Sequence, residues 1–271
     1  MNIIDAHSHI RLYPDAEDLQ DAQNLGINCT HSGFIQELNE NNVAGAIVID
    51  DSLEDETPTG YNSLLELAKQ DKKVFPVLSI NPNKVTLDSY EKLKKGLEEK
   101  LIYGIKIYLG YYPRYATDLV YSEFYSMAGE YGCPVILHTG DTYGEEYLVK
   151  YAHPLQIDEL AVNFKKTNFV IAHLGNPWIR DAAEVVYKNP NVFTDLSAFC
   201  IGKVKNVPKF VYNDIEYAWE YVNNPDKFLY GSDWPLVKMA DYIPIIKKAI
   251  PEEAHNKVFY ENAKRVFRLP I

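Results

Sequence analysis

The chain has few cysteines, no long apolar run and no excess of basic residues, and each shortage excludes a class of protein. Its three cysteines, Cys29, Cys133 and Cys200, lie far apart and form no C-x-x-C pair, which argues against a disulfide framework and a thiolate zinc site. No apolar run of about 18 residues is present, and no signal-peptide pattern follows Met1. We therefore expect a cytoplasmic protein with no membrane partner.

The balance of charge is acidic, with 38 aspartates and glutamates against 27 lysines and arginines and a net charge of −11. An acidic chain without a basic stripe repels phosphate backbones, so nucleic acid is a poor candidate partner. We expect a small-molecule substrate instead. The sequence leaves open whether copies of the chain form a homo-oligomer.

Eight short runs with β-strand character recur through the whole chain, and segments with helical periodicity lie between them. The runs are Ile3–His7, Gly45–Ile49, Val74–Ser79, Tyr103–Leu109, Pro134–His138, Phe169–His173, Val192–Leu196 and Phe228–Ser232. Several of them are apolar on both faces, as in a parallel sheet that is covered by helices. No linker rich in proline, glycine or serine divides the chain.

Eight strand–helix units in about 250 residues predict a single α/β domain over residues 1–271, folded as a (β/α)8 TIM barrel. The alternative is a doubly wound open sheet. That fold explains eight units less well, and the glycine-rich phosphate loop expected after its first strand is missing.

The segment Asp5–His9, with the sequence DAHSH, directly follows the apolar start of the first predicted strand. Because side chains alternate along a strand, His7 and His9 should point the same way. Two neutral imidazoles at this spacing can hold one metal ion. Taken alone, the pair could also be two surface histidines.

Further polar side chains stand where later strands are predicted to end, which is the functional face of such a barrel. They are Lys106 on the fourth strand, His138 on the fifth, His173 on the sixth and Asp233 on the eighth. Each has a plain explanation by itself, as a hydrogen-bonded core histidine or a carboxylate that caps a turn.

Strand alternation decides whether these groups converge. We expect Val135 and Leu137, and likewise Val170 and Ala172, to face the helices, which turns the polar groups of the fifth and sixth strands toward the barrel axis. Four imidazoles and a carboxylate that converge there unpaired would be very costly to bury. A metal ion removes that cost, so the sequence predicts a metal site.

The ordered set His-x-His, Lys, His, His, Asp resembles the amidohydrolase superfamily, and more narrowly the amidohydrolase-related branch that contains aminocarboxymuconate-semialdehyde decarboxylase. The matching motifs are DAHSH at 5–9, GIK at 104–106, HTGD at 138–141, AHLG at 172–175, GSDWP at 231–235 and ENAKRVF at 261–267. The resemblance implies that His7, His9, His138 and Asp233 are metal ligands. It implies that His173 is a further ligand or a catalytic acid/base.

The resemblance leaves the role of Lys106 open. In members with two metals, a lysine on the fourth strand is carbamylated by CO₂ and bridges the ions, which would make Lys106 a ligand. An unmodified Lys106 would instead bind a substrate carboxylate or pair with an acidic neighbour. We expect one or two divalent ions, with zinc (Zn²⁺) foremost and manganese (Mn²⁺) as the alternative.

Several side chains near the expected barrel mouth are candidates for substrate binding, because tyrosines supply rigid walls with polar tips and arginine clamps carboxylates. The candidates are Lys106, Tyr108, Tyr112, His153 and Arg180. The alternatives are a tyrosine loop packed over the rim, a surface histidine and an ion pair on a helix surface.

We expect a metal-dependent hydrolase that cleaves an amide, lactone or ester bond. A divalent ion lowers the pKa of a bound water from 15.7 toward about 7. Asp233 would accept the proton of that water and pass it to the leaving group, while His173 would help to polarise the substrate carbonyl. The alternative, which the resemblance implies, is a metal-dependent non-oxidative decarboxylase of an unsaturated or aromatic carboxylic acid.

Overall fold

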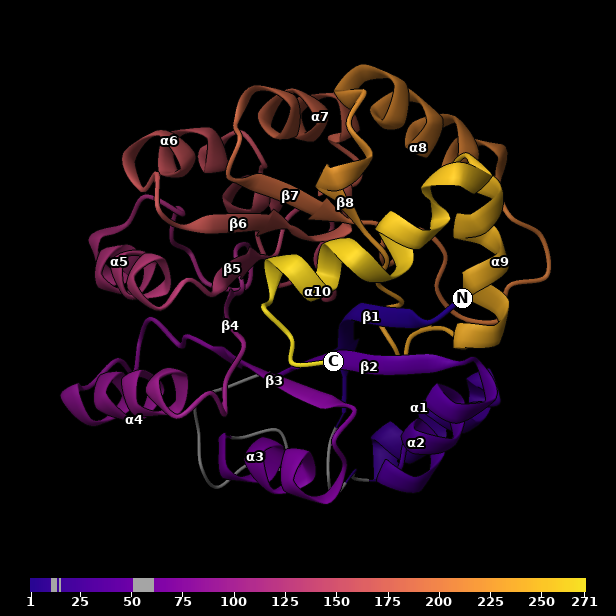
Figure 1. The fold of residues 1–271 in the computed structure, drawn as a ribbon, viewed down its shortest axis with the longest axis horizontal. Helices are drawn as coiled ribbons and strands as arrows, with labels where there is room; N and C mark the ends of the chain where they lie inside the picture. Colours follow the sequence, from indigo (N-terminus) through magenta and orange to yellow (C-terminus); the bar gives the residue numbers. More distant parts are fainter. Residues whose placement is uncertain (11–13, 15, 51–60) are drawn as a thin grey trace.

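The computed structural model describes residues 1–10, 14, 16–50 and 61–271. Within these ranges, eight parallel strands form one sheet in chain order. They are β1 (Ile3–His9), β2 (Val43–Ile49), β3 (Val74–Ser79), β4 (Gly104–Ile107), β5 (Pro134–Leu137), β6 (Asn168–Ile171), β7 (Val192–Asp195) and β8 (Phe228–Leu229). The sheet curls into a nearly closed barrel with helices outside it (Figure 1), so the predicted (β/α)8 TIM barrel is confirmed.

Helices connect successive strands and cover the outer face of the sheet. They are α1 (Ala16–Leu25), α2 (His31–Glu40), α3 (Tyr61–Gln70), α4 (Leu87–Glu98), α5 (Ser122–Tyr131), α6 (Gln156–Asn163), α7 (Ile179–Lys188), α8 (Lys209–Val222), α9 (Met239–Ala249) and α10 (Asn262–Val266). In the described part of the chain, no helix combines the length and apolarity that crossing a bilayer requires. The three cysteines are buried and form no disulfide.

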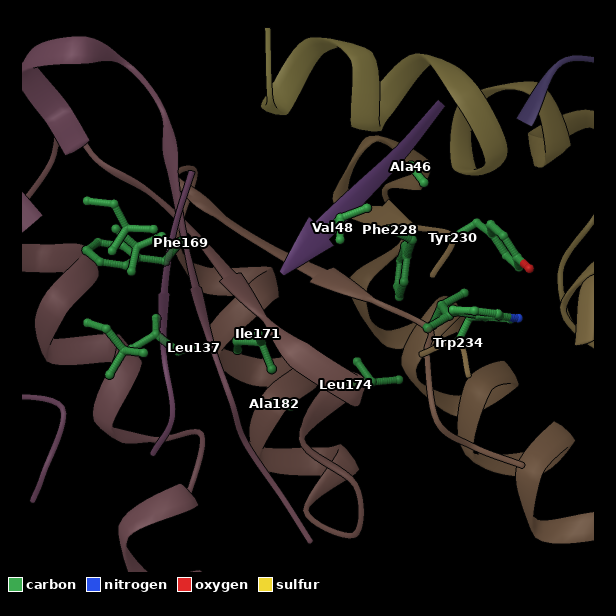
Figure 2. Packing of buried hydrophobic residues seen from close by; sticks show 14 of the residues in the cluster. Ala46, Val48, Leu137, Phe169, Ile171, Leu174, Ala182, Phe228, Tyr230 and Trp234 are labelled. Carbon is green, nitrogen blue, oxygen red and sulfur yellow. The ribbon is translucent and has the colours of Figure 1, made fainter. Parts of the chain in front are cut away.

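An apolar layer between strands and helices holds the outer ring in place (Figure 2). On α7, Ile179, Ala182, Ala183 and Val186 are buried at spacings of three and four residues, which is the pattern of a helix with one face against a core. In Figure 2, Ala182 lies near Ile171 of β6 and both belong to this layer.

A second apolar cluster fills the inside of the barrel. Its residues from the strands are Ile4, Ala6, Ile47, Ile49, Phe75, Val77, Ile136, Val170, Phe193 and Leu229, and Ala172 directly after β6 belongs to it too. The C-terminal segment joins this cluster, and its Phe267 and Ile271 approach Gly104 and Gly45 near the starts of β4 and β2. The end at which the strands begin is therefore closed, and α10 crosses it in Figure 1.

The junction between β1 and β8 is made by few backbone bonds, because β8 is short. Three hydrogen bonds join Ala6 N to Tyr230 O (2.8 Å), Asp233 N to His7 O (2.8 Å) and His9 N to Trp234 O (2.7 Å). The fully buried carboxylate of Asp5 adds to them. Its Oδ1 accepts the backbone N–H groups of Ser232 (2.9 Å) and His7 (3.1 Å), and its Oδ2 contacts the hydroxyl of Ser232 at 2.5 Å.

The expected orientation of the sixth strand is wrong. Val170 and Ala172 lie in the interior cluster, whereas Phe169 and Ile171 face the helices. The strand also ends at Ile171, two residues earlier than predicted. The expectation for Val135 and Leu137 on the fifth strand is correct, since both belong to the layer under the helices.

Candidate active site and metal centre

His7 and His9 reach the barrel interior through an irregularity that simple alternation does not predict. The register between β1 and β2 shifts between Asp5 and Ser8, where β1 carries one residue more than its partner. Ala6 lies in the interior cluster, and a strict period of two would then send His7 to the outer face. The β-bulge restores the inward direction, and the two imidazole rings lie 5.3 Å apart.

His173 also enters the site through a break in the strand. Its backbone φ is 58° and that of Leu174 is 47°, so both residues adopt the left-handed conformation that side chains with a Cβ rarely occupy. The ring of His173 lies 4.7 Å from that of His7 and 5.1 Å from that of His138. Strain at such positions is found where function requires a side chain in a particular place.

Asp233 lies beside the histidine pair of β1 and also has a left-handed backbone, with φ 64°. Its Oδ1 is 3.3 Å from Nε2 of His9 and 3.6 Å from Nε2 of His7. Burial by itself raises the pKa of Asp233, but the hydrogen bond from His9 and the charges of His173 and His7 outweigh it and hold that pKa below its usual value. The hydrogen bond from His9 favours the ionised form of this carboxylate.

His138 follows β5 and is buried. Its Nε2 lies 2.8 Å from the backbone carbonyl oxygen of Asp141, which can only accept, so Nε2 carries the proton. Nδ1 is then the nitrogen that can bind a ligand. Burial, followed by the charges of His173 and Lys106, holds the pKa of His138 well below its usual value, so the ring is neutral.

Lys106 points into the barrel, as its alternation with Ile105 and Ile107 predicts, since both isoleucines belong to the layer under the helices. The side chain is fully buried. Its Nζ lies 3.3 Å from Nε2 of His7 and 5.0 Å from the centre of the Tyr108 ring. Lys106 therefore occupies the place on β4 where the other strands contribute apolar residues to the interior.

Asp195, at the end of β7, is a site residue that the sequence reasoning missed. Its Oδ2 lies 2.9 Å from Nδ1 of His7, and both groups are buried. Burial raises the pKa of Asp195, but the charge and hydrogen bond of His7 and the charge of His173 outweigh it and hold that pKa well below its usual value. The available signal was a carboxylate at the end of a predicted strand, the same signal that identified Asp233.

The histidine protonation states suit a metal ligand. Burial, followed by the charge of Lys106, lowers the pKa of His7 to about 4, and burial likewise lowers the pKa of His173. Because Nδ1 of His7 donates to Asp195, its Nε2 carries a lone pair toward His9 and Asp233.

Two groups of ligand atoms lie close enough to hold an ion, with all atoms of each group within 4.8 Å of one another. One group consists of His7, His9 and Asp233, and the other of His7, His173 and Asp195. Neutral imidazoles with carboxylates are donors that divalent transition-metal ions accept. The first group fits such an ion best, because Asp195 is already saturated by donors from the protein.

Tyrosines from the loop after β4 line one side of the cluster. The ring of Tyr111 packs against His138 with centroids 4.9 Å apart, and against Tyr108 at 5.7 Å and Tyr147 at 4.7 Å. Tyr108 donates its hydroxyl to the carbonyl of Asp50 at 3.3 Å. Tyr112 is half-buried. Tyr111 thus contacts a histidine of the cluster, although the sequence reasoning selected Tyr108 and Tyr112 as candidates for substrate binding.

The structure does not bring His153 and Arg180 into this cluster. The ring of His153 stacks on Trp178 at 4.8 Å, and its Nε2 is 3.6 Å from a carboxylate oxygen of Asp181. Arg180 is exposed on α7, and its guanidinium lies over the ring of Tyr217 on α8 at 4.2 Å. The two side chains therefore contact aromatic rings of neighbouring segments, Trp178 for His153 and Tyr217 for Arg180.

These features define the class of (β/α)8 barrels that gather histidines and carboxylates at the carboxyl ends of their strands, where a divalent ion could be held. The amidohydrolase family model matches residues 4–269, so the chain belongs to the amidohydrolase family. A comparison with curated protein sequences finds no match.

Solved structures share the fold over nearly their whole length. An uncharacterised TIM-barrel protein from Bordetella bronchiseptica has a TM-score of 0.77 and 19% identity, with 99% of each chain covered. A probable 2-pyrone-4,6-dicarboxylic acid hydrolase from Acinetobacter baumannii, with citric acid bound, has a TM-score of 0.68 and 18% identity, covering 99% of this chain and 100% of that one. The 5-carboxyvanillate decarboxylase of Sphingomonas paucimobilis has a TM-score of 0.66 and 13% identity, with 99% of each chain covered.

Proposed function

We propose that the protein is a metal-dependent hydrolase that cleaves an amide, lactone or ester bond of a small organic molecule. The observation that carries the proposal is the position of the Asp233 carboxylate, 3.3 Å and 3.6 Å from the Nε2 atoms of His9 and His7. A buried, ionised carboxylate beside neutral imidazoles combines a metal ligand with a proton acceptor. The same composition would serve no purpose in an apolar core, where it costs stability.

His7, His9 and Asp233 would hold the ion. His173, whose ring lies 4.7 Å from that of His7, and His138, 5.1 Å from His173, are further candidate donors. When bound, a divalent ion supplies a Lewis acid that lowers the pKa of water toward about 7 and polarises a carbonyl group. Asp233 accepts the proton of the attacking water and returns it to the leaving group. The barrel interior below the cluster is apolar.

The role of His173 depends on which nitrogen carries its proton. Its Nδ1 lies 2.8 Å from the hydroxyl oxygen of Ser197, and that hydroxyl donates its hydrogen to Asp195, so Nδ1 carries the proton and the neutral ring presents an unprotonated Nε2. That nitrogen can bind an ion or accept a proton, but it cannot donate a hydrogen bond to a carbonyl oxygen. This supports the ligand or base role over the polarising role expected from the sequence.

Lys106 would complete the site in one of two forms. A carbamylated amine becomes a carboxylate ligand close to His7 and would support a second ion. An unmodified amine would bind the carboxylate of a substrate. Intact mass spectrometry of protein prepared with bicarbonate distinguishes the two forms, because carbamylation adds about 44 Da. The zinc and manganese contents of the same protein report the number and identity of the ions.

A second candidate is a non-oxidative decarboxylase of an unsaturated or aromatic carboxylic acid. The likeness to the 5-carboxyvanillate decarboxylase supports it at the level of the fold, and the wall formed by Tyr108 and Tyr111 suits a planar substrate. Product analysis separates the two candidates, because a hydrolase adds water to its substrate and a decarboxylase releases CO₂.

The experiment is a turnover screen of zinc- and manganese-loaded protein on lactones, amides, esters and unsaturated carboxylic acids. Elemental analysis should find at least one divalent ion per chain, and a chelator should abolish turnover. A chain that neither contains an ion nor takes up zinc would refute the proposal.

Asp233→Asn tests the proposed proton acceptor. The change is nearly isosteric and keeps a ligating oxygen, so we expect the fold to persist and turnover to fall by about 10²–10⁴-fold, as for loss of a general base. Asp226→Asn is the matched control, because Asp226 pairs with Lys257 at 2.7 Å and has no contact with the cluster. Near-normal turnover of Asp233→Asn would show that Asp233 only stabilises the turn and is not the proton acceptor.

A further inference from the structure

Asp195 and Ser197 form a buried hydrogen-bonded unit that contacts two of the site histidines at once. Oδ1 of Asp195 accepts the backbone N–H groups of His173 (3.0 Å) and Ser197 (3.1 Å) and the hydroxyl of Ser197. Oδ2 accepts Nδ1–H of His7 at 2.9 Å. Both residues are fully buried, so water does not replace any of these partners.

The direction of each bond follows from counting hydrogens. The hydroxyl hydrogen of Ser197 is used on Asp195, so the Ser197 oxygen can only accept from Nδ1 of His173, which lies 2.8 Å away. Nδ1 of His7 must also donate, because the oxygen that it faces belongs to the carboxylate of Asp195, which can only accept. Both imidazoles are therefore held with the proton on Nδ1 and the lone pair on Nε2.

We infer that Asp195 and Ser197 are positioning residues that fix the tautomers of His7 and His173, Asp195 directly and Ser197 as the relay from Asp195. Each histidine reaches the site from a different strand, so one carboxylate sets the ligand nitrogen on both β1 and the end of β6. Partners of this kind raise the basicity of a ligating histidine and hold its ring, and losing one costs about 10–100-fold in metal affinity. The effect on affinity rests on the proposed metal-dependent function, whereas the tautomers do not.

In Asp195→Asn, the neighbouring groups determine which way the side-chain amide is oriented. Three donors surround the Oδ1 position, so the amide oxygen must lie there and the amide nitrogen must face His7. Two donors cannot share a hydrogen bond, so His7 should move its proton to Nε2, which lies 3.6 Å from Oδ1 of Asp233 and 3.3 Å from Nζ of Lys106. An Asp→Asn change imposes the wrong histidine tautomer in the catalytic triad of serine proteases by the same logic.

The test is ¹⁵N NMR of the imidazole nitrogens in metal-free protein, together with zinc affinity measured by competition with a chelating indicator. Asp195→Asn should shift His7 to the Nε2–H form, leave His173 unchanged and weaken zinc binding by about 10–100-fold. Ser197→Ala should allow the proton of His173 to occupy either ring nitrogen and leave the tautomer of His7 unchanged. It should weaken zinc binding less than Asp195→Asn does. The two variants therefore give opposite patterns at the two histidines.

Thr194→Val is the matched control. Thr194 is equally buried on β7, but its hydroxyl donates to the carbonyl of Ile171 and contacts no histidine. It should lower the melting temperature without changing either tautomer or the zinc affinity. If both histidines keep the Nδ1–H form in Asp195→Asn and in Ser197→Ala, the inference is overturned. Tautomers that change as expected in a protein that binds no zinc would refute the proposed metal-dependent function and leave the positioning role intact.

Discussion

Replacing Asp5 by alanine should weaken the junction that closes the barrel between β1 and β8. The carboxylate is fully buried and accepts hydrogen bonds from the backbone N–H groups of His7 and Ser232 and contacts the Ser232 hydroxyl at 2.5 Å. Alanine leaves two buried N–H groups without this acceptor, at about 1–3 kcal/mol each. We expect the free energy of unfolding to fall by about 3–5 kcal/mol, a large share of the 5–15 kcal/mol typical of a domain.

Urea denaturation followed by circular dichroism at pH 6 measures this loss in metal-free protein. Asp5→Asn is the control, because its oxygen can accept both N–H groups and its amide can donate to the Ser232 hydroxyl, so it should cost less than about 1 kcal/mol. Ser232→Ala should cost about 1–2 kcal/mol, and the double variant should cost less than the sum of the two single changes.

An unchanged urea midpoint for Asp5→Ala would refute this account of the junction. If Asp5→Ala does not fold, Ser232→Ala still tests it, because this variant removes one bond and keeps the carboxylate. A Ser232→Ala protein as stable as the wild type would show that the contact between Asp5 and Ser232 contributes nothing.

Two further predictions concern charge inside the barrel. Burial raises the pKa of Asp5 from 3.8 to about 7, so its contribution to stability is complete below pH 3.8 and is lost as the pH rises through 7. Between pH 6 and pH 8 the wild type should lose about 1–1.5 kcal/mol relative to Asp5→Asn, and equal pH profiles in urea titrations would contradict this. Lys227 is 8% exposed and donates to three backbone carbonyls around the start of β7 at 2.8–2.9 Å. Lys227→Met should cost about 2–4 kcal/mol in the same assay, against about 0–1 kcal/mol for the surface variant Lys257→Met; similar losses for both would refute a special role for Lys227.

The sequence predicted the barrel because every strand carries its own local signal. Val74–Ser79 was predicted with the bounds that β3 has in the structure, and the other strands differ mainly at their ends. Strand character depends on β-branched and apolar residues that are neighbours in the chain, and eight such runs with helices between them have few ways to bury their apolar faces. The family followed from polar motifs at the strand ends, and the match over residues 4–269 confirms it.

Which side chains meet was decided by backbone details that no local pattern shows. Simple alternation succeeds for Lys106 but does not account for His7 or His173. A bulge turns His7 inward, and left-handed residues after β6 bring in His173 although its strand faces the opposite way from the one expected. Such irregularities are stabilised by contacts distant in the chain, so a reading of neighbouring residues cannot find them.

The sequence by itself determined the architecture and the kinds of ligand that could gather at one end of the barrel. Only the tertiary structure decided that Asp195 holds the Nδ1 proton of His7 and that Arg180 packs on Tyr217 away from the cluster. The physical reason is that a hydrogen bond between residues 188 positions apart, or a cation over an aromatic ring, depends on where whole elements pack. Periodicity in the chain indicates which face of a strand or helix a side chain lies on. Which distant side chain it contacts is decided only when the strands close into a barrel.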